Sequence, residues 1–201
     1  MRRFNFASMK ETTAFLKAFL NNPLAVGSVI PSSPAAGEAM ASNIAPRENS
    51  IVLEIGCGTG AFTEAIAKIL PDEKSYLGVE INRELTEILQ SRFPELQFVN
   101  GDAREAIKIH QKSGLGPVAY IISGLPFASL PKEISEKVLR EVDIFMQRGD
   151  CLFRAIQYST AFYMPAAIEF RRRMENLYGR TDVSPLIWRN VPPAYALTWR
   201  T

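Results

Sequence analysis

Three glycines at alternate positions follow an apolar run in the segment VLEIGCGTG, residues 52–60. They are Gly56, Gly58 and Gly60. Glycines placed after a strand let the backbone turn tightly and allow a ligand to approach it closely. The spacing of Gly56, Gly58 and Ala61 also satisfies the loose dinucleotide fingerprint, so the glycines alone do not identify the ligand.

Acidic residues stand at or near the ends of three successive apolar segments. Glu54 precedes the glycines, Glu80 ends the segment LGVE, and Asp102 follows the segment ending at residue 100. A carboxylate at Glu54 would repel a pyrophosphate and attract an ammonium or sulfonium group. Glu80 suits the hydroxyls of a ribose, which NAD would also present, and Asp102 suits the exocyclic amine of adenine. The three acids together favour S-adenosylmethionine, although each alone also fits a structural turn or a helix cap.

The elements around these residues alternate between strand and helix patterns. This alternation predicts an α/β fold in which a mostly parallel seven-stranded sheet carries helices on both faces. No helix pattern separates the last two strands, so we expect them to form a hairpin with an antiparallel edge. The expected strands are 51–55, 76–80, 96–100, 118–123, 151–157, 184–189 and 194–200, and the expected helices are 7–20, 34–44, 61–70, 83–93, 103–111, 132–145 and 166–177. Open sheets of this kind bind ligands at the carboxyl ends of their strands, where the glycine turn lies.

Composition places few limits on function. The 201 residues suit one α/β domain, and the net charge of +2 does not by itself indicate nucleic-acid binding. Cys57 and Cys151 lie far apart and His110 is the single histidine, so we expect no metal site and a reducing cytosol. We expect no signal peptide, and no run approaches the ~20 apolar residues that span a bilayer.

The glycine motif and the three acids resemble those of the class I S-adenosylmethionine-dependent methyltransferases, over roughly residues 51–160. Three further segments make nearly the whole chain similar to the bacterial phospholipid N-methyltransferases, which act on phosphatidylethanolamine, with some relatives acting on ornithine lipids. These segments are VGSVIPSS at 26–33, SGLPF at 123–127 and NVPPA at 190–194. The resemblance implies a Rossmann-like fold, with N-terminal amphipathic and cofactor-lid helices over residues 1–45 and the methyltransferase domain over 46–201.

The resemblance also implies roles for individual residues. Ser123, Phe127 and Tyr158 would frame the reacting amine, with Phe127 and Tyr158 facing the developing cation. Arg189, Arg180 and Asn190 would bind the substrate, the arginines through its phosphate, for which Arg154 is a further candidate. S-adenosylmethionine, and its product S-adenosylhomocysteine, would contact Glu54, Gly56, Gly58, Gly60, Glu80, Ile81, Asp102, Ala103, Ser123, Ser32 and Ser33.

The first twenty residues carry large apolar groups on one helical face and basic groups on the other. This pattern is typical of a helix lying in a membrane interface, and it equally fits a helix packed on the domain. With a lipid substrate, we expect a monomer that is peripheral on the inner face of the cell membrane, contacts anionic lipid through this helix and binds no nucleic acid.

Two other functions remain open. A ribosomal RNA adenine N6-methyltransferase would share the cofactor site, although such enzymes carry Asn where this chain has Gly124 and usually add an RNA-binding domain. A catalytically silent module that keeps the fold is the second alternative. Replacing Glu80 with Ala should abolish turnover in an enzyme, whereas it should leave the partner binding of such a module intact.

Overall fold

The strands and helices alternate along the chain as expected. The computed structural model describes residues 32–201. Three short 3-10 turns join these elements: η1 (Glu73–Ser75), η2 (Ala103–Glu105) and η3 (Ser159–Ala161). The regular elements are α2 (Pro34–Ala41), β1 (Ile51–Ile55), α3 (Ala61–Ala67), β2 (Tyr76–Glu80), α4 (Arg83–Arg92), β3 (Gln97–Asn100), α5 (Ala106–Ser113), β4 (Val118–Ser123), α6 (Lys132–Met146), β5 (Leu152–Tyr158), α7 (Pro165–Tyr178), β6 (Asp182–Val183) and β7 (Ala194–Arg200).

One seven-stranded sheet has the order β3-β2-β1-β4-β5-β7-β6. The pairs among β1 to β5 are parallel, and β7 runs antiparallel to both β5 and β6. This arrangement confirms the predicted mixed sheet. The strand order reverses between β1 and β4, and the carboxyl ends of parallel strands at such a switch point form the ligand crevice of open α/β sheets.

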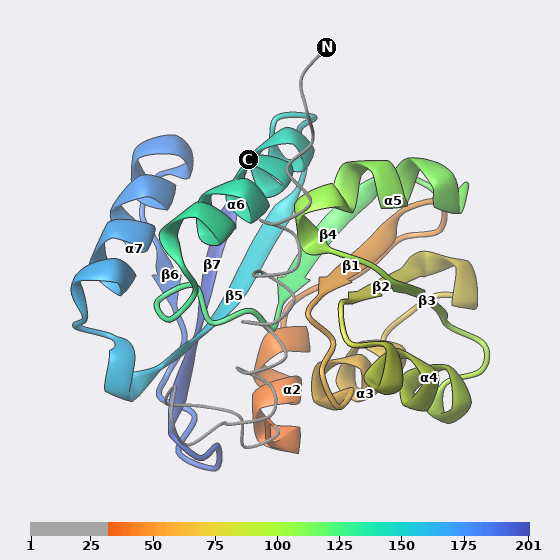
Figure 1. Cartoon of the computed structure of the whole chain (residues 1–201), viewed down its shortest axis with the longest axis horizontal. Helices are drawn as coiled ribbons and strands as arrows, with labels where there is room; N and C mark the ends of the chain where they lie inside the picture. The colour runs from red at the N-terminus through yellow and green to blue at the C-terminus, as the bar shows by residue number, and fades with distance from the viewer. Residues whose placement is uncertain (1–31) are drawn as a thin grey trace, which may run out of the picture. The chain divides into compact units, whose positions relative to one another are not determined.

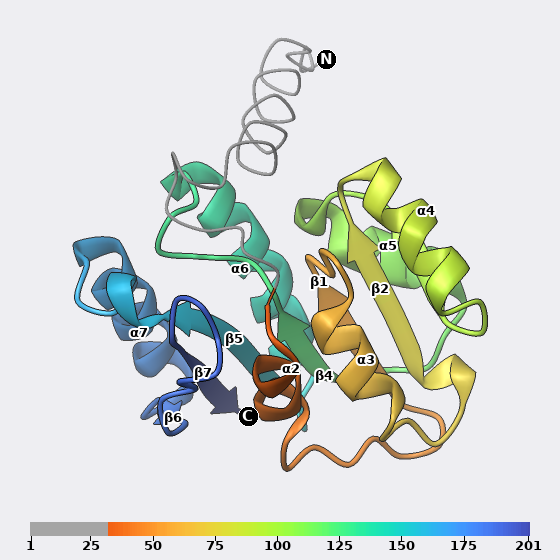
Figure 2. The same cartoon turned by 90° about the horizontal axis from the view of Figure 1, so that it is seen from below.

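Helices cover both faces of the sheet (Figure 1). Side chains of α5, α6 and α7 pack with one face of the strands in the larger apolar cluster, which includes Ile109, Leu139 and Phe170. Side chains of α2, α3 and α4 pack on the other face, where Met40 and Ile66 are fully buried. Figure 2 shows α2 and α3 side by side on this face. Both helix layers bury apolar side chains against the sheet, and this packing fixes the positions of the strands whose carboxyl ends form the ligand edge.

Buried polar side chains hold both ends of helix α2. Ser33 is its N-cap, since its hydroxyl accepts from Ala36 N at 3.2 Å, and the Ser33 N–H donates to Asn190 Oδ1 at 2.8 Å. At the other end, Nη1 of Arg154 donates to the carbonyls of Met40 at 3.0 Å and Ser42 at 2.6 Å. Arg154 thereby satisfies carbonyls that the helix end leaves without partners.

Replacing Arg154 with Met is expected to lower the free energy of unfolding by about 3 kcal/mol, because buried carbonyls lose charged donors. Its Nε also donates to Thr198 Oγ1 at 2.8 Å, so the variant removes a link between β5, β7 and α2. Arg172→Met, at an exposed position on α7, is the matched control and should change stability by less than about 0.5 kcal/mol. Urea denaturation measures both, and equal stability of the two variants would contradict this role for Arg154.

One predicted strand differs from the structure. The strand expected over 184–189 is wrong: β6 is only Asp182–Val183, and the following residues form a loop with one bridge between Ile187 and Ala194. Pro185 has no N–H to donate, which ends the ladder. The compact unit that contains the described residues begins at Pro31 and includes α2. The amphipathic helix predicted over 7–20 and most of the segment 26–33 lie outside the described residues.

Candidate cofactor and substrate site

The glycine turn stands where the sequence placed it, directly after β1. Its first amide, Gly56 N, donates to the carbonyl of Val79 at 2.9 Å, which joins the turn to β2. Gly58 and Gly60 have φ values of +55° and +85°, a backbone conformation that favours glycine. A Cβ added at Gly58 would meet no atom of residues 32–201 within 4 Å, so this part of the turn is not covered by the described chain. The backbone at Gly58 is therefore accessible to a ligand.

Glu80 ties the end of β2 to the glycine turn. Its Oε2 accepts from Gly58 N at 2.8 Å and its Oε1 accepts from Asn82 N at 2.9 Å. The side chain is nearly buried, and this burial raises the pKa of the carboxyl although the two backbone donors oppose the shift. Each carboxylate oxygen has a second lone pair. Glu80 can thus brace the turn and still accept hydrogen bonds from two hydroxyls of a ribose.

Glu54 is fully buried at the end of β1 and has only half of its hydrogen-bonding capacity filled. Its Oε2 accepts from the hydroxyls of Tyr76 at 2.7 Å and Thr63 at 2.8 Å. Its Oε1 is buried and has no partner within the described residues. Burial raises the pKa of Glu54 to about 7, against the lowering effect of the two hydroxyl donors. An unpartnered buried carboxylate oxygen fits an ammonium group as ligand.

This raised pKa predicts a pH-dependent stability. The folded chain binds the Glu54 proton more tightly than the unfolded chain, so the stability contribution falls as pH rises from the unfolded value of 4.5 to about 7. Glu54→Gln cannot titrate and supplies the reference. Between pH 5 and 8, without ligand, the wild type should lose about 3 kcal/mol of unfolding free energy relative to Glu54→Gln. Urea denaturation measures the difference, and parallel pH profiles would contradict it.

Asp102 lies after β3 at the same edge of the sheet but is already paired. Its Oδ1 accepts from Arg104 N at 2.9 Å as the N-cap of η2, and both of its carboxylate oxygens accept from the Arg104 guanidinium. Arg104, which sequence reasoning missed, thus competes with the predicted contact to an adenine amine. Ala103 begins η2 beside this pair, and Ile81 O accepts from Asn100 Nδ2 at 3.0 Å. Asn100 is a second missed residue, which joins β3 to the end of β2.

The turn after β4 packs directly against the glycine turn. Gly124 N donates to Ile55 O at 3.0 Å, and a Cβ added at Gly124 would lie 2.3 Å from Gly56 O. Ser123 is fully buried, and its hydroxyl accepts from Leu125 N at 3.2 Å, so its side chain stabilises this turn. The backbone from Ser123 to Leu125 therefore borders the ligand-binding edge, and only a glycine fits at its centre.

Phe127 does not face this edge, and its predicted place beside the reacting amine is wrong. Its side chain is buried in the larger apolar cluster, where the ring stacks on Phe170 with centroids 4.7 Å apart. It also meets Phe153 edge-on at 6.1 Å. Phe127 therefore fixes the turn after β4 through packing and cannot contact a cation in the crevice.

The predicted substrate residues divide into two groups. Tyr158 ends β5 and is half-buried, and the exposed Arg189 lies in the loop before β7, whose first residue Ala194 pairs with Tyr158. Both therefore lie at the ligand edge. Arg180 does not: it follows α7, which runs back from that edge, and precedes β6, whose Asp182 lies level with the first half of β5. The structure therefore does not support the phosphate role predicted for Arg180.

Three other predicted contacts have structural roles in the described chain. Asn190 is buried, with Oδ1 accepting from Ser33 N and Nδ2 donating to Pro192 O at 2.8 Å, so its amide cannot also bind substrate. Arg154 is buried against α2 and is not a phosphate ligand. Ser32 and Ser33 lie at the ligand edge, but the Ser33 side chain caps α2. Among residues 32–201, no group of His, Cys, Asp and Glu side chains could hold a metal ion.

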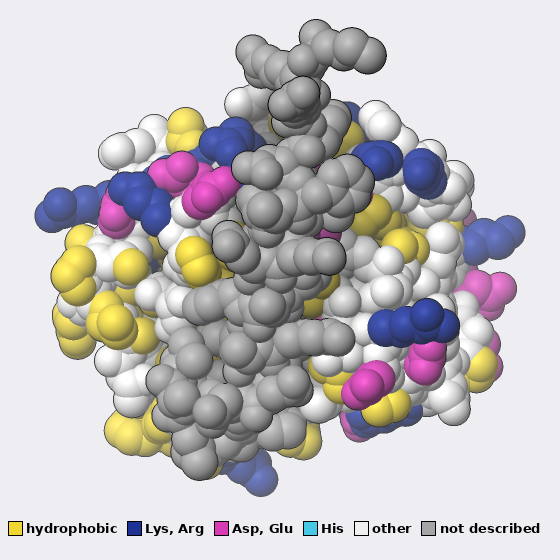
Figure 3. All heavy atoms as spheres, viewed as in Figure 1, with side chains coloured by type: hydrophobic (Ala, Val, Ile, Leu, Met, Phe, Trp, Pro, Cys, Tyr) yellow, Lys and Arg dark blue, Asp and Glu magenta, His cyan; other side chains and the backbone are white. Residues whose placement is uncertain are grey.

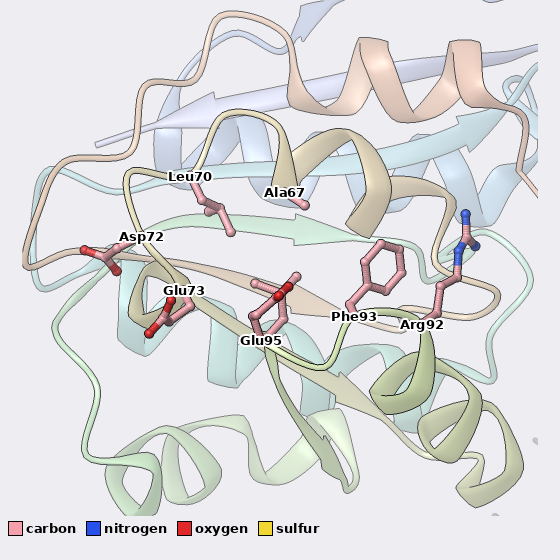
Figure 4. Close-up of a pocket in the computed structure, with 8 residues that line it drawn as sticks. Ala67, Leu70, Asp72, Glu73, Arg92, Phe93 and Glu95 are labelled. Atoms are coloured by element: carbon pink, nitrogen blue, oxygen red, sulfur yellow. The ribbon is translucent and has the colours of Figure 1, made fainter.

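A cavity of about 350 Å³ lies elsewhere, between α3, η1 and the connection from α4 to β3 (Figure 4). Its lining combines apolar side chains with Asp72, Glu73 and Glu95, and none of the glycine-turn residues contributes to it. Arg92 lines its other end and donates to Thr59 O at 3.1 Å, which places a cation behind the glycine turn. We therefore keep the candidate site at the carboxyl edge of the sheet.

The chain is similar to several known proteins. A family model described as a methyltransferase domain matches residues 52–149. The chain is 33% identical over 138 residues to an ornithine lipid N-methyltransferase of Singulisphaera acidiphila, which covers 67% of this chain and 71% of that protein. It is 29% identical over 82 residues to ribosomal RNA small subunit methyltransferase A of Chlorobaculum parvum, covering 41% of this chain and 28% of that enzyme. Fibrillarin of Aeropyrum pernix, solved with S-adenosyl-L-methionine bound, shares the fold with a TM-score of 0.57, 14% identity and coverage of 83% and 74% of the two chains.

Proposed function

Because the chain belongs to the S-adenosylmethionine-dependent methyltransferases, we propose that it methylates the amine of an aminolipid headgroup, either phosphatidylethanolamine or an ornithine lipid. The relative from Singulisphaera acidiphila supports this proposal, since the chain spans 71% of a protein named for N-methylation of a lipid. The match to the ribosomal RNA enzyme is confined to 28% of that protein. A match over so small a part of that enzyme is weak support for an RNA substrate.

The observation that carries the choice of lipid over RNA is the fit around Gly124. In adenine methyltransferases the corresponding position holds the Asn whose amide binds the target amine. Here any side chain at this position would begin 2.3 Å from the carbonyl oxygen of Gly56, far inside van der Waals contact. The chain thus lacks the base-reading amide and has no room for one. A flexible primary amine needs no such planar partner, because carbonyl oxygens can accept its hydrogen bonds.

The chain's own residues fit the methyl donor and would position the acceptor beside it. S-adenosylmethionine, when bound, supplies an electrophilic methyl group on its sulfonium. Glu54 Oε1 would accept from the ammonium group, Glu80 would accept from the ribose hydroxyls, and Gly58 would leave space for close approach. The nearby positive charge would lower the pKa of Glu54, so ligand binding favours its ionised form.

Methyl transfer to an amine is an in-line displacement that requires a free lone pair on nitrogen and exclusion of water. We propose that backbone carbonyls of the Ser123–Leu125 turn hold the amine at the end of β4. Tyr158, at the end of the neighbouring strand β5, would close the other side of the nitrogen. Arg189 would contact the acidic group of the headgroup, a role for which its guanidinium is suited. These roles use residues that share one edge of the sheet.

The proposal is tested with vesicles of matched size and charge. Purified full-length protein is incubated with labelled S-adenosylmethionine and vesicles that contain phosphatidylethanolamine, ornithine lipid, or only phosphatidylcholine and phosphatidylglycerol. Label is expected in an amine-bearing lipid and absent from the last mixture. Headgroup chromatography identifies the acceptor. Absence of label from both amine-bearing lipids, with the donor shown to bind, would contradict the proposal.

A further inference from the structure

Two loops at the ligand edge expose large apolar side chains. Tyr163 and Met164 follow β5 and are 83% and 46% exposed. Trp188 and Val191 lie before β7 and are 74% and 60% exposed. We call these four residues the apolar rim. Large aromatic side chains are normally at least half covered in folded chains, so this much exposure at one edge needs an explanation.

The two loops are held side by side. Ser159 N, after β5, donates to Pro193 O, before β7, at 2.8 Å. The ring of Phe162, in the first loop, also packs against the ring of Tyr195, which follows the second loop, with centroids 4.8 Å apart. Because Tyr158 pairs with Ala194, both loops leave the sheet at the edge that carries the glycine turn. Figure 3 shows hydrophobic side chains gathered around the beginning of α7, where the first loop ends.

The one charged side chain within these two loops is basic. Neither loop, residues 159–165 and 184–193, contains an Asp or Glu, whereas Arg189 is exposed between Trp188 and the buried Asn190. Behind Tyr163, the guanidinium of Arg171 lies 4.1 Å from the centroid of the Phe162 ring. Trp and Tyr side chains beside a cation, in loops that contain no carboxylate, are typical of surfaces that enter the interface of a bilayer with anionic lipid.

We infer that the apolar rim is a docking surface for an anionic bilayer, which it enters to a shallow depth beside the crevice. The inference deepens the proposed function, because a lipid headgroup would then reach the end of β4 without leaving the bilayer. Within residues 32–201, none of the helices has the length and hydropathy of a membrane span. The rim is separate from the N-terminal segment to which the sequence assigned membrane contact.

The chain offers a direct readout, because its two tryptophans differ in environment. Trp188 is 74% exposed and Trp199 is 1% exposed in the core. Phosphatidylglycerol-containing vesicles should shift the emission of Trp188 to shorter wavelength, and lipids brominated near the headgroup should quench it. Trp188→Phe should abolish both changes, since Trp199 stays buried. Unchanged Trp188 emission on vesicles that cosediment with the full chain would overturn the inference.

A paired variant separates this inference from the proposed function. Replacing Tyr163 and Trp188 together with Ser should weaken vesicle partitioning at least tenfold, because two interfacial aromatic contacts are lost. Ile88→Ser, at a 55% exposed position on α4, is the matched control and should partition normally. On a short-chain aminolipid below its micelle concentration, the double variant should keep wild-type turnover. Normal partitioning of the double variant would refute the role of the apolar rim in membrane docking. If wild-type protein methylates neither the vesicle-bound nor the short-chain aminolipid, the proposed function is refuted instead.

Discussion

Glu80→Ala is expected to weaken S-adenosylmethionine binding about 100-fold and to remove turnover at ordinary donor concentrations. The carboxylate would accept hydrogen bonds from two ribose hydroxyls, and a hydrogen bond to a charged group contributes about 1.5–3 kcal/mol. The variant also frees the amides of Gly58 and Asn82, which Glu80 holds at 2.8 and 2.9 Å in the described structure. The ligand therefore loses both a direct partner and the order of the glycine turn.

Isothermal titration with S-adenosylhomocysteine measures this effect without depending on the lipid acceptor. Glu84→Ala, which removes an exposed carboxylate on α4 four residues later, is the control and should bind as the wild type does. The affinity of Glu80→Gln for S-adenosylhomocysteine should lie between those of Glu80→Ala and Glu84→Ala, because the Gln side chain keeps one acceptor oxygen. Wild-type affinity in Glu80→Ala would place the ribose elsewhere and contradict the site.

Gly124→Ala is expected to have the second large effect. The added methyl would stand 2.3 Å from Gly56 O, so either the turn after β4 or the glycine turn must shift. Displacing the reacting groups by about 1 Å can reduce turnover by roughly 100-fold, and overpacking a tight contact costs about 1–3 kcal/mol of stability. We expect both losses together, measured as kcat/KM on amine-bearing vesicles and as the unfolding midpoint in urea.

Gly116→Ala provides a matched control at the other end of β4. A Cβ there would lie 2.4 Å from the carbonyl oxygen of Asn49, which is nearly the same clash with backbone. Its unfolding free energy should fall by a similar amount, but donor affinity should remain within about twofold, because the clash lies at the opposite edge of the sheet. Equal loss of donor binding in both variants would mean that Gly124 acts only through stability.

The parts of the site that the sequence predicted are those set by local chemistry. The turn after β1 has positive φ at positions 58 and 60, which favours glycine, so its glycines mark it in the sequence. Glu80 marks the end of β2, because the apolar run of that strand stops there. Alternation of strands and helices then brings these segments to one edge.

Residues whose roles depend on distant partners were predicted less well. The sequence predicts that Phe127 faces the developing cation, whereas its ring stacks on Phe170 of α7 in the core. Asn190 and Arg154 looked like ligands, yet both bind α2, which lies more than a hundred residues earlier. Arg180 is predicted as a phosphate ligand from its guanidinium alone, but α7 runs back from the ligand edge and so leaves Arg180 far from the site. No local pattern carries such information.

Competition in one vessel tests the central claim most directly. Full-length protein, labelled S-adenosylmethionine, vesicles containing phosphatidylethanolamine and ornithine lipid, and small ribosomal subunits lacking adenine dimethylation are incubated together and then separated into lipid and RNA. The account predicts that label enters the lipid fraction at an amine nitrogen and that Glu80→Ala abolishes it. Label recovered in adenine, with the lipid fraction empty, would contradict the account.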